Sequence, residues 1–138
     1  MKSKLFLIAI ASFLMLSCSS LAQNSDKKIK NILIGTWSGS EDDNQKQGMT
    51  KYWITVHNTN GTFIRTYMVI KNCEVENFID KGKWKFEDGL YYETFESDGK
   101  TDIYTLEILD DANVKFKAKE ISLEMNNKEY EFTETKQE

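Results

Sequence analysis

The chain carries one arginine, Arg65, in the middle of the apolar segment NGTFIRTYMVI at residues 60–70. Alternation along a β-strand predicts that Arg65 and Tyr67 share one face, and we expect this face to continue into Glu93 and Tyr104 on later strands. An unpaired charge in an apolar interior is costly, so a guanidinium there must be paired or solvated. The candidate chemistry is the binding of an anionic group, because arginine binds carboxylates through two parallel hydrogen bonds.

Two main interpretations of Arg65 are open at this point. In the first, Arg65 anchors a carboxylate or another anionic head group of a ligand, with the hydroxyl groups of Tyr67 and Tyr104 beside it. In the second, Arg65 pairs with Glu93 inside the protein, or stacks on a tryptophan, and contacts no ligand. A third case is a different strand register, which would put Arg65 on the surface.

Neither a nucleophile with its base nor a metal-binding cluster stands out in the sequence. Glu93 and Asp102 could form an acid–base pair, but beside an arginine and tyrosine hydroxyl groups they are better explained as neutralising charge. His57 is the only histidine, and we expect it on the outer surface without a partner at metal-ligand spacing. The acidic residues 41–43 lack the spacing of an EF-hand and are interpreted as a solvated loop. We therefore expect no enzymatic activity, no metal and no cofactor.

The elements that must position these side chains are β-strands. After a polar leader over residues 23–31, with at most a short helical turn, runs of β-branched and aromatic residues alternate with turn dipeptides. This pattern favours an all-β domain over 32–138, an antiparallel up-and-down barrel of eight strands that leaves no open edge. The predicted strands cover residues 33–39, 49–58, 61–70, 78–87, 90–97, 100–109, 114–119 and 128–134.

The turn dipeptides predict which side chains face the barrel interior. A two-residue turn at Asn60-Gly61 places Tyr52 on the same face as Arg65. The Asp-Gly turn of the next hairpin places Trp84 inward, opposite Glu93, and leaves three lysines of that strand outside. Tyr52, Arg65, Tyr67, Trp84, Glu93 and Tyr104 are therefore the candidate ligand-binding residues.

The same register predicts an unusually apolar outer face on the second and third strands. Its members are Trp53, Ile64, Met68 and Ile70. Such a face either lies under the N-terminal leader or binds a partner.

The connections between the strands predict a barrel with one closed end and one open end. Alternate connections of an up-and-down barrel lie at the same end, and binding sites in such folds lie in the more open mouth. One end is predicted to carry the tight turns at 60–61, 88–89 and 111–113, and the other the longer connections over 41–48, 71–77 and about 120–127 together with a tight turn at 98–99.

The segment IGTW resembles the Gly-x-Trp signature of lipocalins, with Gly35 and Trp37 at the signature positions. Together with NGTF at 60–63 and GKWKF at 82–86, it makes nearly the whole segment 32–134 similar to short bacterial lipocalin-like domains. The resemblance implies an exported single-domain β-barrel with a cavity for an apolar ligand. The family pattern also includes an arginine on the last strand that stacks on the signature tryptophan, whereas the last predicted strand here has no arginine.

The first 22 residues have the pattern of a secretory signal peptide, with lysines before the apolar segment Leu5–Leu16. Cleavage after Ala22 would give a soluble protein that is secreted or periplasmic. In the alternative, the segment MLSC is a lipobox, Cys18 is acylated, and this lipid anchor makes the only membrane contact. The formal net charge of −4 argues against nucleic acid as a partner.

These observations lead to two hypotheses of different classes. In the first, an exported lipocalin-like monomer binds a small hydrophobic or amphipathic ligand in its open end. In the second, a cell-envelope or secreted interaction protein has a barrel filled by its own side chains and takes no ligand. A cavity of several hundred Å³ favours the first hypothesis, and a packed interior favours the second.

Overall fold

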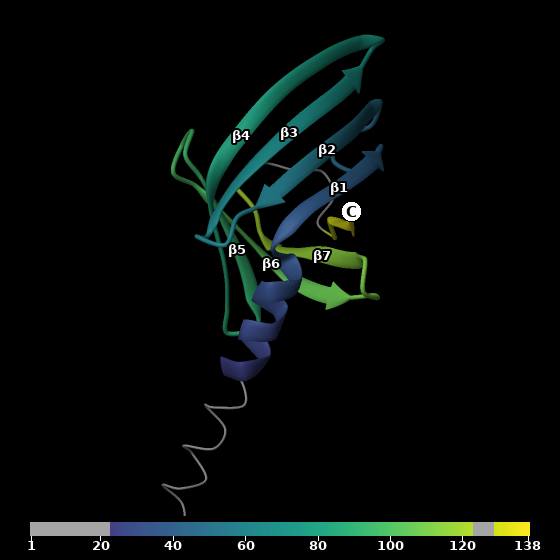
Figure 1. Ribbon diagram of the computed structural model, residues 1–138. Coiled ribbons are helices and arrows are strands. Elements are labelled where there is room, and N and C mark those ends of the chain that lie inside the picture. The colour runs from purple at the N-terminus through teal and green to yellow at the C-terminus, as the bar shows by residue number, and fades with distance from the viewer. Residues whose placement is uncertain (1–22, 123–128) are drawn as a thin grey trace, which may run out of the picture.

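A computed structural model describes residues 23–122 and 129–138 of the chain. Within them, a helix over residues 23–33 precedes eight antiparallel strands that close into a barrel, with each strand beside its neighbour in sequence (Figure 1). The strands are β1 (Gly35–Asp42), β2 (Met49–His57), β3 (Thr62–Lys71), β4 (Glu74–Glu87), β5 (Leu90–Phe95), β6 (Thr101–Ile108), β7 (Asn113–Glu120) and β8 (Glu131–Lys136). Because β1 pairs with both β2 and β8, the barrel is closed, and the predicted eight-stranded up-and-down architecture is confirmed.

Some of the predicted features lie outside the described residues. They are the signal peptide over 1–22, with Cys18, and most of the predicted connection over 120–127. In the part of the chain that the structure describes, no helix is both long and apolar enough to cross a membrane.

The segment predicted to be a polar leader forms the helix over residues 23–33 instead of a single helical turn. Leu33, at the end of this helix, is fully buried, and its carbonyl accepts a hydrogen bond of 2.7 Å from the indole nitrogen of Trp37. The carboxylate of Asp26 accepts a hydrogen bond of 2.7 Å from the backbone N–H of Asp88, in the β4–β5 turn. The helix therefore covers the barrel end that was predicted to be closed (Figure 1).

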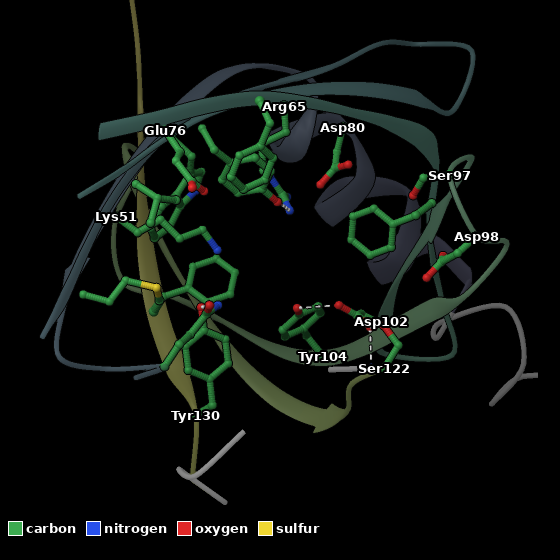
Figure 2. Close-up of a pocket in the computed structure, with 18 residues that line it drawn as sticks. Lys51, Arg65, Glu76, Asp80, Ser97, Asp98, Asp102, Tyr104, Ser122 and Tyr130 are labelled. Atoms are coloured by element: carbon green, nitrogen blue, oxygen red, sulfur yellow. Dashed lines mark hydrogen bonds between the residues drawn. The ribbon is translucent and has the colours of Figure 1, made fainter. Parts of the chain in front are cut away.

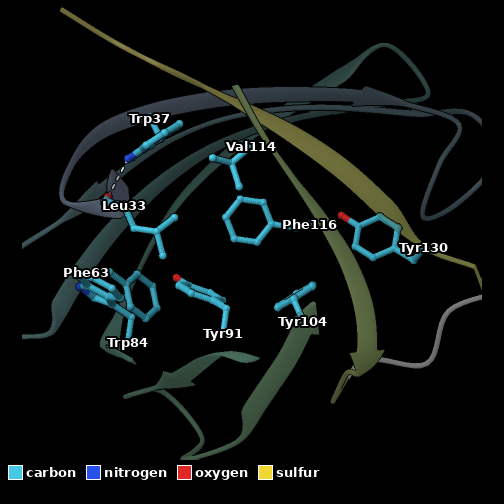
Figure 3. Close-up of a cluster of buried hydrophobic side chains, with 9 residues drawn as sticks. All are labelled: Leu33, Trp37, Phe63, Trp84, Tyr91, Tyr104, Val114, Phe116 and Tyr130. Atoms are coloured by element: carbon cyan, nitrogen blue, oxygen red, sulfur yellow. Dashed lines mark hydrogen bonds between the residues drawn. The ribbon is translucent and has the colours of Figure 1, made fainter. Parts of the chain in front are cut away.

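The hydrophobic core extends from the helix into the barrel (Figure 3). It forms because alternate residues of each strand point inward, while the intervening lysines of β4 and β7 point outward. The buried cluster consists of Leu33, Trp37, Phe63, Trp84, Tyr91, Tyr104, Val114, Phe116 and Tyr130.

The connection between β2 and β3 is a three-residue loop and not the predicted two-residue turn. The N–H of Asn58 donates to the carbonyl of Thr62 at 2.8 Å, so these two residues close the loop. Gly61, with a φ of 81°, has the left-handed conformation that is typical of the last residue of such a loop. The side chain of Asn60 accepts hydrogen bonds from the N–H and hydroxyl of Thr62, at 3.1 and 2.8 Å. The extra loop residue shifts the register by one position.

This shift exchanges the inner and outer faces of β2 relative to the prediction, because side chains alternate between the two faces of a strand. His57, Thr55 and Trp53 face the interior, where they are only 1%, 0% and 5% exposed. Tyr52 points outward and is 43% exposed. The predictions that Tyr52 lines the interior and that His57 and Trp53 lie on the outer face are therefore wrong. Arg65, on β3, is buried inside the barrel as predicted.

The other hairpins keep the predicted inner faces. The β4–β5 pairing follows the predicted turn at Asp88-Gly89, where both residues have positive φ. The β5–β6 connection has four residues instead of two, but a shift by two positions leaves Asp102 and Tyr104 inside. The long connection predicted over 71–77 is a tight turn at Asn72-Cys73, so the β3–β4 hairpin is longer than predicted.

Candidate functional site

The barrel contains a cavity of about 420 Å³ at the end away from the helix (Figure 2). Its wall combines aromatic side chains with charged groups of both signs. The aromatic members are Trp53, Tyr67, Phe78, Phe95, Tyr104, Tyr130 and Phe132. The charged members are Lys51, Arg65, Glu76, Asp80, Asp98 and Asp102.

Arg65 forms a two-point ion pair with Glu93 at the inner limit of this cavity. The two guanidinium nitrogens donate to the two carboxylate oxygens at 2.6 and 2.7 Å. The guanidinium also donates to the hydroxyl groups of Thr55, at 2.8 Å, and Tyr67, at 3.2 Å. Burial alone would lower the pKa of Arg65, but the Glu93 carboxylate raises it, so the arginine stays charged. Of the sequence interpretations, this geometry matches the internal ion pair.

A second carboxylate, Glu134 on β8, lies behind this pair. It accepts hydrogen bonds from the Trp53 indole, at 2.7 Å, and from the Thr55 hydroxyl, at 3.1 Å, and one of its oxygens is 4.0 Å from Arg65. Burial, opposed by the charge of Arg65, raises the pKa of Glu134. Because Arg65 is already paired with Glu93, its charge offsets only part of the effect of burial on Glu134.

His57 continues the buried network toward the helix. Its Nε2 atom is 2.7 Å from the hydroxyl of Tyr91, and that hydroxyl donates to Glu93 at 3.1 Å. Burial, and to a smaller extent the charge of Arg65, lowers the pKa of His57 to about 3. The imidazole is therefore neutral at physiological pH, and its ring packs edge-on against Trp84, with 5.0 Å between ring centroids.

Lys51 is a second cation of the cavity wall, and its ion pair with Glu41 is longer than that of Arg65 with Glu93. Its ammonium nitrogen lies 4.6 Å from the centre of the Tyr67 ring and 3.9 Å from a carboxylate oxygen of Glu41. Figure 2 shows this ammonium group pointing into the cavity. Burial, which outweighs the opposing effect of Glu41, lowers the pKa of Lys51.

Two carboxylates of the wall differ in how they are held. One oxygen of Asp102 accepts hydrogen bonds from the N–H and the hydroxyl of Ser122, at 2.8 and 2.7 Å (Figure 2). Asp80 lies on β4, beside Arg65 in the sheet register, and its carboxylate points into the cavity. Among the described residues, Asp80 makes no side-chain hydrogen bond and no ion pair within 4.0 Å.

The structure divides the candidate ligand-binding residues into three groups. Arg65, Tyr67 and Tyr104 line the cavity. Trp84 and Glu93 are buried and lie outside its wall. Tyr52 lies instead in a second, more open pocket of about 760 Å³ on the outer surface.

The signature residues Gly35 and Trp37 lie at the start of β1, near the helix. The ring of Trp37 is 1% exposed, and the ammonium group of Lys136 lies 5.3 Å from its centre. Lys136 also donates to the carbonyl of Ile32 at 2.9 Å and so connects β8 to the helix. The cation over the signature tryptophan thus comes from the last strand, as in the lipocalin pattern, but it is a lysine. Sequence reasoning missed it because it considered only arginine.

Lys51 and Asp80 are two of the cavity residues that sequence reasoning missed. The predicted two-residue turn, which puts Tyr52 inside, puts its neighbour Lys51 on the outer face, and the shift of one residue in register reverses this. Asp80 could have been found, because the inward alternation of Trp84 and Gly82 continues directly to Asp80 and Phe78 along the same strand.

No known protein-family model matches the chain, and no curated protein sequence matches it significantly. In the described residues, no three histidine, cysteine, aspartate or glutamate side chains are grouped so that they could hold a metal ion.

Proposed function

We propose that this protein is an exported lipocalin-like barrel that binds a small, largely apolar ligand in its open end. The observation that carries the proposal is the cavity of about 420 Å³, which falls within the range of small-molecule sites. The aromatic side chains of its wall, which stand beside convergent polar groups, are also typical of such sites. The Gly35 and Trp37 signature, with a cation from β8 over the tryptophan, supports the likeness to lipocalins.

The geometry supports a modified role for the residues that were predicted to bind the ligand. Tyr67 and Tyr104 offer ring surface and hydroxyl groups to the cavity. Arg65 contributes to the inner wall, but its hydrogen-bonding capacity is largely used by Glu93, Thr55 and Tyr67. We therefore assign Arg65 to the structure of the barrel and not to ligand recognition.

A neutral, polarity-sensitive dye such as phenylnaphthylamine is expected to bind the wild-type protein with increased fluorescence. The Val69→Trp variant should abolish most of this signal, because Val69 lines the cavity and the larger ring would fill part of it. The matched control is Ile70→Trp, which adds the same indole on the outer face of the same strand. Equal dye binding by both variants would contradict the proposal, provided that both unfold at the wild-type denaturant concentration.

A second candidate function is the binding of a partner protein by the outer face of the barrel. Several large apolar side chains on β2, β3 and β4 are exposed there: Tyr52, Ile54, Ile64, Met68, Val75 and Ile79. The helix over residues 23–33 does not cover this face, because it lies at the closed end. Contiguous exposed apolar surface is typical of interaction sites. The simplest form of this alternative is self-association through the outer face. It predicts that the wild-type protein self-associates with increasing concentration and that an Ile54→Lys variant does not.

A further inference from the structure

The cations of the cavity wall are already matched by carboxylates. Arg65 is neutralised by Glu93 at 2.6 Å, directly behind the wall. Lys51 has Glu41 at 3.9 Å and lies over the ring of Tyr67. Arg65 therefore leaves little positive field in the cavity, and Glu41 reduces the field of Lys51, whose ammonium group points into the cavity.

The carboxylates of the wall are not matched in the same way. Asp102 is held by neutral donors of Ser122, which stabilise its negative charge without cancelling it. Asp98 is exposed and has Lys100 at 3.4 Å, and Glu76 is exposed to solvent, which screens its charge. Asp80 is half-buried, points into the cavity and interacts electrostatically with Lys51, but in the described part of the chain it has no side-chain hydrogen bond and no ion pair within 4.0 Å. The cavity thus has an excess of negative charge, with its least satisfied group at Asp80.

The apolar part of the wall is suited to the same kind of ligand. Tyr67 on β3 and Phe78 on β4 are paired across the sheet. Their ring centroids are 4.7 Å apart, and the rings are stacked. Along β4, Phe78 lies between Asp80 and Glu76, and Tyr67 is the partner of Phe78 on β3. Aromatic faces attract cations through the ring quadrupole and also pack against apolar groups.

We propose that the ligand carries a positively charged amino group on an aromatic or apolar body, and that Asp80 is its counter-ion. This inference rests on the proposed ligand-binding function. In the complex, the ammonium group donates to the Asp80 carboxylate, and the body of the ligand lies against Tyr67, Phe78 and Tyr104. The amine provides the hydrogen-bond donors that Asp80 lacks in the protein alone.

Calorimetric titration with three ligands of similar shape tests this assignment. The probes are tryptamine, the corresponding indole carboxylate and an uncharged alkylindole of the same size. We expect tryptamine to bind about ten- to a hundredfold more tightly than the uncharged compound, which is the range for a hydrogen bond to a charged group. The carboxylate should bind most weakly, because it would lie beside Asp80 and Asp102.

Three variants test which side chain is responsible for the preference for tryptamine. Asp80→Asn keeps the shape of the side chain and should lower the affinity for tryptamine about tenfold or more, with little change for the alkylindole. Asp98→Asn is the matched control, since Asp98 also lines the cavity but is exposed and paired with Lys100. It should change the affinity for tryptamine less than about threefold. Lys51→Gln removes a repelling charge and should strengthen tryptamine binding.

The outcomes separate this inference from the proposed function. If the carboxylate binds most tightly, or if tryptamine and the alkylindole bind equally, the charge assignment is wrong while ligand binding itself stands. The assignment also fails if Asp80→Asn and Asp98→Asn have the same effect, or if the dye binds and tryptamine does not. If neither the three indoles nor the neutral dye bind, the ligand-binding function fails.

Discussion

Replacing Arg65 with methionine is expected to lower the free energy of unfolding by about 3–5 kcal/mol. Methionine fills most of the space but leaves Glu93, which is 1% exposed, without its cation. The hydroxyl groups of Thr55 and Tyr67 lose a donor at the same time. Equilibrium unfolding in urea, followed by tryptophan fluorescence, measures the loss.

Two further variants test whether the loss of stability comes from breaking the buried ion pair. Combining Arg65→Met with Glu93→Leu removes both charges, so it should recover a large part of the lost stability. Lys85→Met breaks the ion pair with Glu87 on the surface, where both side chains are more than half exposed, and should change the free energy of unfolding very little. An Arg65→Met protein as stable as wild type that no longer binds ligand would instead support Arg65 as an anchor for an anionic ligand.

Acidification should reveal the second large effect, which comes from the buried His57. The pKa of His57 is lowered to about 3 in the folded protein, compared with about 6.5 for an exposed histidine. The unfolded chain therefore binds a proton that the folded protein does not. This contribution to stability is fully present above pH 6.5 and is lost progressively as the pH falls toward 3. Between pH 7 and pH 4 the loss should reach about 3 kcal/mol.

The His57→Gln variant isolates this contribution. Glutamine can still form a hydrogen bond with Tyr91 but cannot take up a proton, and all carboxylates are the same in both proteins. The difference in unfolding free energy between wild type and variant should therefore shrink as the pH falls from 6.5 to 4. Parallel stability curves over this range would mean that His57 is accessible to protons in the folded protein.

The sequence predicts the barrel well where local chemistry fixes the structure. Asp88-Gly89 is a two-residue turn in which both residues have positive φ, so it sets the β4–β5 register and turns Trp84 and Glu93 inward. The alternation of lysines with aromatic residues fixes the inner face of β4 and β7 without reference to any partner strand. These signals agree with one another, which is why the overall architecture follows from them.

The candidate site is harder to predict because it depends on one loop residue. An Asn-Gly pair is compatible with both a two-residue turn and the end of a three-residue loop, and the two differ by one position in register. The choice decides whether Tyr52 or Lys51 faces the cavity, and whether His57 is buried. The pairing of Arg65 with Glu93 depends on the packing of two separate hairpins, so the sequence offered it only as one of the open interpretations.

If the proposed function is correct, the open end of the barrel holds a small ligand. Native mass spectrometry of the mature protein purified from its own host tests it most directly, with the denatured mass showing whether cleavage precedes Gln23 or Cys18 carries lipid. We predict a bound mass that is released on denaturation, retained by Ile70→Trp and absent from Val69→Trp. A native mass equal to that of the polypeptide in all three proteins, or the same bound mass in both variants, would contradict the account.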